Sequence, residues 1–305
     1  MPGPDVLVVD DDDATRDGLC ELLALDGFSV GCEKDGAQAL ERIRTHDVKV
    51  VLLDVLLPGL GGLDVLARSA EEGSRARIII MTGMDTPETV LGALRDHAYA
   101  FLAKPIEPPR LIEVVRKALT TALVPPIEVL TARPDWVELL VPCTREAADR
   151  IQSFMHQLEA DLPSDIRESV GLAFRELLLN GIEWGGQLNP SQKVRVACVR
   201  TRRMLLYRIA DPGPGFTLAQ LPHAAVSGDE TVIAHDQVRQ EKGLRPGGFG
   251  LVLIRAIADE LLYNEQRNEV LFVKYLDEPR EVPSQPAVTD VALSLLQGRR
   301  PIEHD

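Results

Sequence analysis

Several short apolar runs in the first third of the chain end in side chains that can bind a cation or a phosphoryl group. The runs are VLVVDD, VVLLD, RIIIMT and AFLAK, and the polar residues at their ends are Asp10, Asp11, Asp54, Thr82 and Lys104. If the runs are parallel strands of one open sheet, their carboxyl ends lie at the same edge and these side chains converge. Crowded carboxylates need a cation, and hard oxygen ligands favour Mg²⁺. Thr82 and Lys104 would stabilise a phosphoryl group on Asp54.

Each of these residues also has an ordinary structural interpretation. The run from Asp10 to Asp13 can be a solvated cap on a helix, and Lys104 can be a surface lysine before Pro105. For any one of these residues taken alone, the structural interpretation is sufficient. The full set, in order and each at the end of an apolar run, favours a Mg²⁺-dependent site at which a carboxylate accepts a phosphoryl group.

A second group of polar residues interrupts an apolar helix in the second half. In FRELLLNGIEWGG (Phe174–Gly186), Glu176, Asn180 and Glu183 follow one another at spacings of four and three. These spacings place the side chains on one stripe of a helix. The stripe is either the solvated face of an amphipathic helix or part of a ligand site.

Two glycine-rich segments follow this helix. ADPGPGF (Ala210–Phe216) contains Asp-x-Gly-x-Gly, in which Asp211 can accept a hydrogen bond from an exocyclic amine. RPGGFGLVLIRAIADE (Arg245–Glu260) leads straight into a helix, and free backbone N–H groups at a helix start favour phosphate. No Lys-Ser/Thr pair follows the glycines, so this segment is not a P-loop.

The elements that would position these residues fall into two patterns. Buried strands alternate with helices up to residue 121, which predicts a doubly wound α/β domain with a parallel sheet. A Pro-bearing stretch at 122–133 is predicted to be a linker. Residues 134–280 show a strand, helices over Arg145–Leu162 and Asp165–Trp184, two strands, a loop, a helix and a closing strand, which predicts an α+β sandwich. Residues 281–305 form a C-terminal tail of unknown role.

Composition excludes several classes of function. The chain has 305 residues and a formal net charge of −14, which disfavours a nucleic-acid surface. No apolar run has the roughly 20 residues that a membrane helix needs, and no basic signal-peptide region opens the chain. The four cysteines (Cys20, Cys32, Cys143, Cys198) lack metal-ligand or CxxC spacing and are expected to be reduced thiols. We therefore expect a cytoplasmic protein.

The first half resembles the receiver domain of bacterial response regulators. The resemblance rests on VVDDD, LLDVLLPGLGG, MTG and FLAKP and extends from Asp5 to Ala118. It implies a flavodoxin-like fold and an upstream histidine kinase as partner. It also implies that Asp54 is the phosphoacceptor, that Asp10 and Asp11 hold Mg²⁺ with it, and that Thr82 and Lys104 contact the phosphoryl group. Phe101 matches the family's rotating aromatic residue, and a purely structural core aromatic is an equal alternative.

The second half resembles the Bergerat-type ATPase fold, in which three sequence boxes surround Mg-ATP. The resemblance rests on the order of the Glu/Asn helix, the Asp-x-Gly-x-Gly loop and the glycine-rich helix start. It implies that Asn180 binds Mg²⁺ and that Asp211 binds the adenine amine. The residues implied to line the nucleotide or cover its phosphates are Gly213, Gly215, Lys242, Arg245, Gly247, Gly248 and Gly250.

The layout from Pro134 to Tyr275 is most similar to the anti-sigma-factor serine/threonine kinases within that superfamily. Glu176 would then be the general base that activates a substrate hydroxyl. Trp184 departs from this group, many of whose members carry a histidine there. His156 faintly resembles a histidine-kinase phosphoacceptor, but it lies only 20 residues before Glu176, too close for the helical hairpin that should separate the two boxes.

These resemblances predict a response regulator whose output is a serine/threonine kinase controlled by phosphorylation of Asp54. Its partner would be an anti-anti-sigma-type regulatory protein. A second hypothesis is a phosphorylation-gated binding module that sequesters a sigma factor or its antagonist without catalysis. A third is a histidine-kinase-like fragment. The sequence leaves homodimerisation, the identity of the partner and the sign of regulation open.

Overall fold

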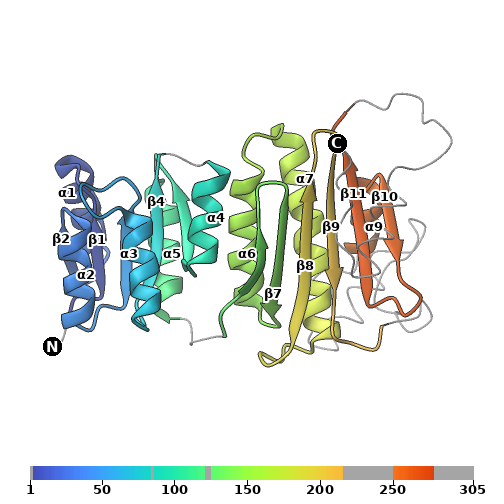
Figure 1. Cartoon of the computed structure of the whole chain (residues 1–305), viewed down its shortest axis with the longest axis horizontal. Coiled ribbons are helices and arrows are strands. Elements are labelled where there is room, and N and C mark those ends of the chain that lie inside the picture. Colours follow the sequence, from blue (N-terminus) through green and yellow to red (C-terminus); the bar gives the residue numbers. More distant parts are fainter. Residues whose placement is uncertain (1–2, 84–85, 121–124, 216–249, 278–305) are drawn as a thin grey trace.

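The first half of the chain alternates strand and helix around one parallel sheet. The computed structural model describes residues 3–83, 86–120, 125–215 and 250–277 (Figure 1). The elements of the first domain are β1 (Val6–Val9), α1 (Asp13–Leu25), β2 (Val30–Glu33), α2 (Gly36–Thr45), β3 (Val50–Asp54), α3 (Gly62–Glu71), β4 (Arg77–Thr82), α4 (Pro87–Arg95), β5 (Ala100–Ala103) and α5 (Pro108–Thr120). The strand order is β2-β1-β3-β4-β5 and every pairing is parallel. The predicted doubly wound α/β fold is confirmed.

The central strands are apolar on both faces because helices cover both faces. On β1, Val6 and Val8 belong to one core cluster, whereas Leu7 and Val9 belong to the other. This alternation follows from the period of two along a strand. Asp12 caps α1 by accepting a hydrogen bond from the N–H of Thr15 at 2.7 Å. The capping interpretation of the acidic run therefore holds for Asp12.

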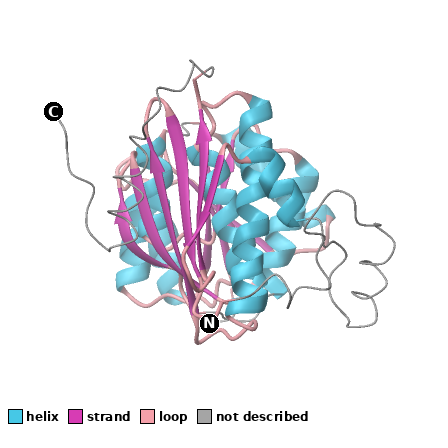
Figure 2. Ribbon diagram, turned by 90° about the vertical axis from the view of Figure 1, so that its right-hand side faces the viewer, coloured by secondary structure: helices cyan, strands magenta, loops and turns pink. Residues whose placement is uncertain are grey.

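The second domain is an antiparallel sheet with helices on one face (Figures 1 and 2). Its elements are β6 (Glu128–Ala132), β7 (Trp136–Pro142), α6 (Arg145–Leu158), α7 (Ser164–Asn180), the π-helical turn η1 (Gly181–Gly185), β8 (Lys193–Arg200), β9 (Met204–Ala210), α9 (Gly250–Ile257), β10 (Glu260–Tyr263) and β11 (Glu269–Tyr275). The strand order is β10-β11-β9-β8-β7-β6. Aromatic residues from the helices and the sheet meet in the core, where the rings of Phe174 and Tyr207 lie 4.7 Å apart. The predicted α+β sandwich is confirmed.

The structure differs from the sequence expectations in four elements. Residues 128–132, inside the segment predicted to be a linker, form β6, which pairs with β7 at the edge of the second sheet. Strands β2 and β10 were not expected, and both are short edge strands whose burial is only partial. Helix α7 ends at Asn180, and the chain then widens into η1 instead of continuing to Trp184.

The expectation of four reduced cysteines is wrong for one pair. Cys20 on α1 and Cys32 on β2 form a disulfide, because the helix packs directly on that edge strand. Their separation of 12 residues has no sequence signature. Cys143 and Cys198 are free and buried.

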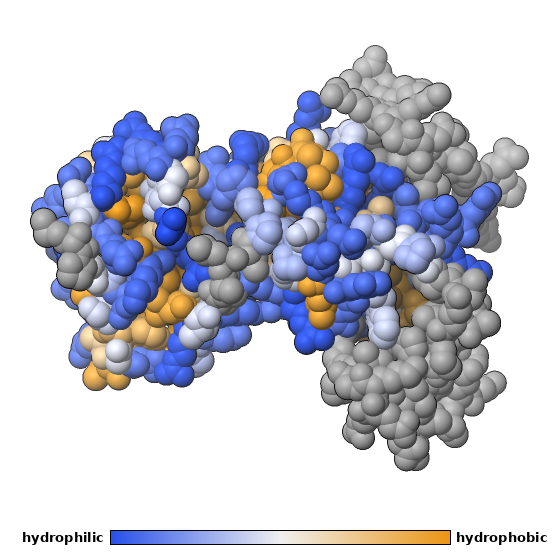
Figure 3. Space-filling view, turned by 90° about the horizontal axis from the view of Figure 1, so that it is seen from below, coloured by the Kyte–Doolittle hydropathy of each residue, from blue (hydrophilic) through white to orange (hydrophobic). Residues whose placement is uncertain are grey.

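The surface is largely hydrophilic on the face shown in Figure 3, with apolar patches interspersed. Exposed large hydrophobic residues such as Leu25, Leu56 and Trp184 lie on separate elements. Among the described helices, none is long and apolar enough to cross a membrane.

Candidate functional site

The acidic residues of the first domain converge at the carboxyl end of the parallel sheet. One carboxylate oxygen from each of Asp10, Asp11 and Asp54 lies within 4.8 Å of the other two. Asp10 and Asp54 are buried, at 1% and 5% exposure, whereas Asp11 is exposed. Ligand oxygens around an octahedral Mg²⁺ ion lie about 3 to 4 Å apart, given Mg–O distances of about 2.1 Å. The bound of 4.8 Å is slightly wider than this spacing, and the three carboxylates form a group that could hold a metal ion.

Lys104 bridges two of these carboxylates. Its Nζ atom lies 2.7 Å from Asp10 Oδ2 and 2.9 Å from Asp54 Oδ1. Burial raises the pKa of Asp54, although Lys104 opposes that rise. Burial would lower the pKa of Lys104, but its hydrogen bonds to Asp10 and Asp54 raise this pKa overall. The site therefore holds a lysine cation beside a partly desolvated carboxylate.

The backbone packs closely around Asp54. The N–H of Leu56 donates to Asp54 Oδ2 at 3.2 Å. A Cβ atom on Gly62 would lie 2.0 Å from the carbonyl oxygen of Asp54, so only glycine permits this close approach. Thr82 is fully buried at the end of β4, where its carbonyl accepts a hydrogen bond from the N–H of Lys104. Phe101 is buried on β5.

In the second domain, Glu176 and Asn180 both lie in the last two turns of α7. Asn180 is the last residue of α7, and η1 begins at the next residue. A π-helical turn is rare and is frequently found at functional sites. Because of this turn, Glu183 does not continue the helical stripe of Glu176 and Asn180 that was expected from sequence. The Glu183 carboxylate instead accepts a hydrogen bond from Arg145 Nε at 3.0 Å. Glu183 therefore belongs to an ion pair with the start of α6.

The loop after β9 lies directly against η1. A Cβ atom on Gly185 would lie 2.1 Å from Asp211 Oδ1, and one on Gly213 would lie 2.7 Å from the Cα atom of Gly185. The N–H of Gly213 donates to Asp211 Oδ1 at 2.8 Å, and burial raises the pKa of Asp211 to about 6. Gly215 has φ of +80°, which a residue with a side chain rarely adopts. The glycines therefore allow this loop to pack around a half-buried carboxylate.

The start of α9, which follows the glycine-rich segment in sequence, lies against α7 at Glu176. A Cβ atom on Gly250, the first residue of α9, would lie 2.5 Å from Glu176 Oε2. The Glu176 carboxylate therefore faces the start of the helix that follows the glycine-rich segment. Lys242, Arg245, Gly247 and Gly248 lie outside the described residues. Among the described ones, the Glu/Asn helix, the Asp211 loop and the start of α9 are brought together.

The two domains contact each other through α6. Arg150 donates from Nε to the carbonyl of Tyr99 at 3.1 Å and from a terminal nitrogen to the carbonyl of Ala98 at 3.3 Å. The Tyr99 hydroxyl lies 3.5 Å from Glu146 Oε1. Both Arg150 and Glu146 lie on α6, whereas Ala98 and Tyr99 immediately precede β5. Helix α6 is thus attached to the strand that carries Phe101 and leads to Lys104.

A chain of charges continues from this contact to α7. Lys117 on α5 forms an ion pair with Asp149 on α6. Arg175 on α7 donates to Asp149 Oδ1 at 2.8 Å. Burial opposes ionisation of Asp149, but Lys117 and Arg175 lower its pKa overall. Because Arg175 directly precedes Glu176, this three-member chain joins the first domain to the helix of the second site. Sequence reasoning missed it, since its members are far apart along the chain.

Comparisons with known proteins agree with the division of the chain into two domains. The family model of the response regulator receiver domain matches residues 6–116, and that of the histidine kinase-like ATPase domain matches residues 141–274. The DNA-binding response regulator MtrA of Mycobacterium tuberculosis (strain H37Rv) is 34% identical over 182 residues, which cover 59% of this chain and 78% of that protein. The chemotaxis protein CheY of Bacillus subtilis is 31% identical over 115 residues, which cover 37% of this chain and 96% of that protein.

Solved structures also match the first domain. A CheY-like receiver domain protein from Methanospirillum hungatei is 27% identical, covers 37% of this chain and 91% of its own, and has a TM-score of 0.37. Receiver domains generally use Mg²⁺ and imply an upstream histidine kinase, and the acidic cluster here suits that chemistry. The chain therefore belongs to the response regulator family, and a histidine kinase-like ATPase domain follows its receiver domain.

Proposed function

We propose that this response regulator is an ATP-dependent serine/threonine protein kinase whose activity is controlled by phosphorylation of Asp54. Its substrate would be a regulatory protein of the anti-anti-sigma type. The observation that carries the proposal is the position of the Glu176 carboxylate, which faces the start of α9. A proton acceptor at this place would lie next to the phosphates of a bound nucleotide.

In the receiver domain, an oxygen of Asp54 would attack the phosphorus atom of the donor. The new bond joins Asp54 to phosphorus, and the bond from phosphorus to the donor's leaving group breaks. Lys104, 2.9 Å from Asp54, would neutralise charge on the transferred group, and Thr82 would donate its hydroxyl to it. Asp10, Asp11 and Asp54 would hold Mg²⁺, which supplies further neutralisation of the phosphoryl oxygens when bound.

In the second domain, Asp211 would accept a hydrogen bond from the adenine amine. Asn180 would hold Mg²⁺ through its side-chain oxygen, and Gly213, Gly215 and Gly250 would let the backbone approach the nucleotide. Glu176 would take the proton of the substrate hydroxyl as that oxygen attacks the terminal phosphorus. The bond between the β- and γ-phosphoryl groups then breaks and ADP leaves. Lys242, Arg245, Gly247 and Gly248 would complete the phosphate site.

The contacts of α6 support control by the receiver. Tyr99 and Ala98, whose carbonyls accept hydrogen bonds from Arg150, immediately precede β5, the strand that ends beside Lys104. A phosphoryl group adds nearly two negative charges to the acidic site. A resulting shift of β5 would act on α6 directly, and the chain from Lys117 to Arg175 would pass it to α7.

The test is to incubate the purified chain with labelled ATP and candidate partner proteins. We expect label on a serine or threonine of the partner, with loss of labelling in Glu176→Gln, Asn180→Ala and Asp211→Asn. Glu168→Gln is the matched control, because Glu168 is an exposed acid on the same helix. If the partner is bound and controlled but no variant labels it, the second domain is a phosphorylation-gated binding module. Label on a partner's histidine would support the third hypothesis.

A further inference from the structure

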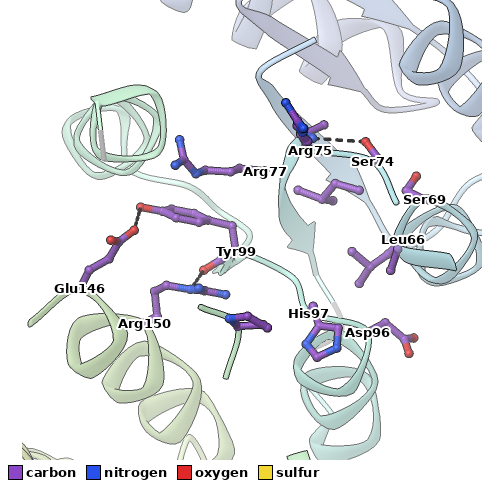
Figure 4. Close-up of a pocket in the computed structure, with 14 residues that line it drawn as sticks. Leu66, Ser69, Ser74, Arg75, Arg77, Asp96, His97, Tyr99, Glu146 and Arg150 are labelled. Atoms are coloured by element: carbon purple, nitrogen blue, oxygen red, sulfur yellow. Dashed lines mark hydrogen bonds between the residues drawn. The ribbon is translucent and has the colours of Figure 1, made fainter. Parts of the chain in front are cut away.

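A pocket of about 260 Å³ lies at the junction of the two domains (Figure 4). Its lining comes from α3, β4 and the end of α4 in the receiver, and from α6 in the ATPase domain. The pocket is slightly smaller than the roughly 300 to 1,000 Å³ that drug-sized ligands occupy, so it suits a small metabolite. It lies at the amino-terminal ends of the receiver strands, and the acidic site lies at their carboxyl ends.

The side of this junction pocket nearest α6 is cationic. Tyr99 lies between Arg77 and Arg150 in Figure 4, and the central carbons of their guanidinium groups are 5.7 and 5.2 Å from its ring centroid. The two acceptors of Arg150 are neutral carbonyls, and among the described residues no carboxylate lies within ion-pair distance of it. Burial lowers the pKa of Arg150. A partly buried guanidinium of this kind is stabilised by an anion.

The opposite side of the pocket offers a hydroxyl group. Ser69 on α3 is 1% exposed, and its Oγ atom has no hydrogen-bond partner. Figure 4 shows Ser69 across the pocket from Tyr99 and Arg150. A buried hydroxyl without a partner is unfavourable, and a hydrogen bond to a ligand's polar group would offset that cost. The unpaired hydroxyl of Ser69 is therefore a second indication of a ligand, separate from the arginines near α6.

The acidic residues of the lining do not cancel its positive charge. The lining contains three arginines and one histidine against Asp96 and Glu146. Burial raises the pKa of both carboxyls. His97 stands at the rim with φ of +63°, where glycine would be the less strained residue. The three arginines outnumber the two carboxyls, so the formal charge of the lining is positive, which favours an anion.

We propose that the junction pocket binds a small organic dianion bearing a hydroxyl group, either a phosphate monoester or a dicarboxylate. Arg150 binds the anionic group, and Ser69 hydrogen-bonds to the far end of the molecule. Arg77, on the other side of the Tyr99 ring and hydrogen-bonded to the carbonyl of Ala118, adds positive charge nearby without contacting the ligand. Because both domains line the pocket, an occupant favours the docked arrangement of receiver and ATPase domain. This site is separate from both phosphoryl-transfer sites, so the proposal does not depend on the proposed kinase activity.

The test is calorimetric titration of the full chain with glycerol 3-phosphate and with malate, which distinguish phosphate from carboxylate. Glycerol serves as the neutral comparison. We expect saturable binding of at least one dianion and none of glycerol. Arg150→Gln should weaken that binding about 10-fold or more, as expected for a lost hydrogen bond to a charged group. Arg68→Gln, an exposed arginine beside Ser69 that does not line the pocket, should leave the affinity unchanged.

Ser69→Ala is a second test variant, needed because Arg150→Gln also removes hydrogen bonds between the two domains. This variant removes only the unsatisfied hydroxyl, so the melting temperature should stay equal or rise while the affinity falls several-fold. Three results would each overturn the proposal: no saturable binding of either dianion, wild-type affinity in a folded Arg150→Gln or Ser69→Ala, or competition by ATP. Competition would place the dianion in the nucleotide site instead.

Discussion

At the scale of single residues, the charge environment of Asp54 decides whether the receiver accepts a phosphoryl group. Lys104 lies within hydrogen-bond distance of both Asp54 and Asp10. We predict that acetyl phosphate with Mg²⁺ labels the wild-type chain and that Asp54→Asn abolishes the label. Asp64→Asn, an exposed acid on α3, is the control and should keep it. Mass spectrometry of the intact proteins measures the outcome, and equal labelling of Asp54→Asn would refute the assignment.

Asp211 yields a prediction in which stability and binding move in opposite directions. Burial raises its pKa to about 6, so its folded-state pKa exceeds the ordinary value of 3.8. The ionised carboxylate therefore destabilises the free protein above pH 6, and the effect disappears as the pH falls toward 4. At pH 7.5, Asp211→Asn should melt at the same temperature as wild type or higher.

The same substitution should remove nucleotide binding. A ligand at about 100 times its Kd adds about 2.7 kcal/mol to the stability of a protein that binds it only when folded. Mg-ATP should raise the melting temperature of wild type and not that of Asp211→Asn. In wild type the ATP affinity should also fall as the pH drops below about 6, where the carboxylate gains a proton. A full ATP shift in Asp211→Asn would show that Asp211 does not hold the nucleotide.

At the scale of elements, the atoms packed against each position of the second domain decide whether that position requires glycine. A Cβ atom on Gly185 would lie 2.1 Å from Asp211 Oδ1, whereas one on Gly171, within α7, meets nothing within 4 Å. Gly171→Ala should stabilise the chain by about 0.5 to 1 kcal/mol, the usual gain from alanine in a helix. Gly185→Ala should displace the Asp211 loop and reduce the thermal shift caused by Mg-ATP. An undiminished shift in Gly185→Ala would contradict this arrangement.

Sequence patterns predicted the elements that have strong local signals. The fully buried runs of β1 and β3 were predictable because their apolar residues are consecutive. Strand β6 was missed because its side chains are at most partly buried and it lies in a Pro-bearing stretch. The turn η1 was missed because a helix that widens after Asn180 keeps the same apolar spacing up to that point. The disulfide and the charge chain through Asp149 depend on tertiary packing, which local patterns do not contain.

The charge chain through Asp149 carries a prediction about coupling. Asp149→Asn removes the anion shared by Lys117 and Arg175 and should lower the free energy of unfolding by about 1 to 2 kcal/mol, because these partners are partly exposed. Labelling of Asp54 by acetyl phosphate should persist. Phosphorylation of Asp54 should change the ATP-dependent activity less in Asp149→Asn than in wild type. Glu168→Gln, the exposed acid on α7, should alter neither property.

At the scale of the whole molecule, the acidic site and the nucleotide site lie on different domains that share one packed junction. Helix α6 contacts α4 and β5 of the receiver and α7 of the ATPase domain. Such a three-way contact allows a two-state change in the receiver to bias the second site without a flexible tether. We predict that phosphorylation of Asp54 changes the rate of Glu176-dependent phosphoryl transfer to the partner more than it changes partner affinity.

The experiment compares wild type, Asp54→Asn and Glu176→Gln, each with and without a small phosphodonor, and scores partner labelling and partner binding separately. In wild type the donor should change the labelling rate, and in Asp54→Asn that response should vanish while basal labelling remains. Glu176→Gln should bind the partner and label it in neither condition, because it retains the shape of the site without the proton acceptor. If the donor changes binding as strongly in Glu176→Gln as in wild type, and no variant labels the partner, control operates through sequestration. The junction would then gate a binding surface, and the kinase proposal would be wrong.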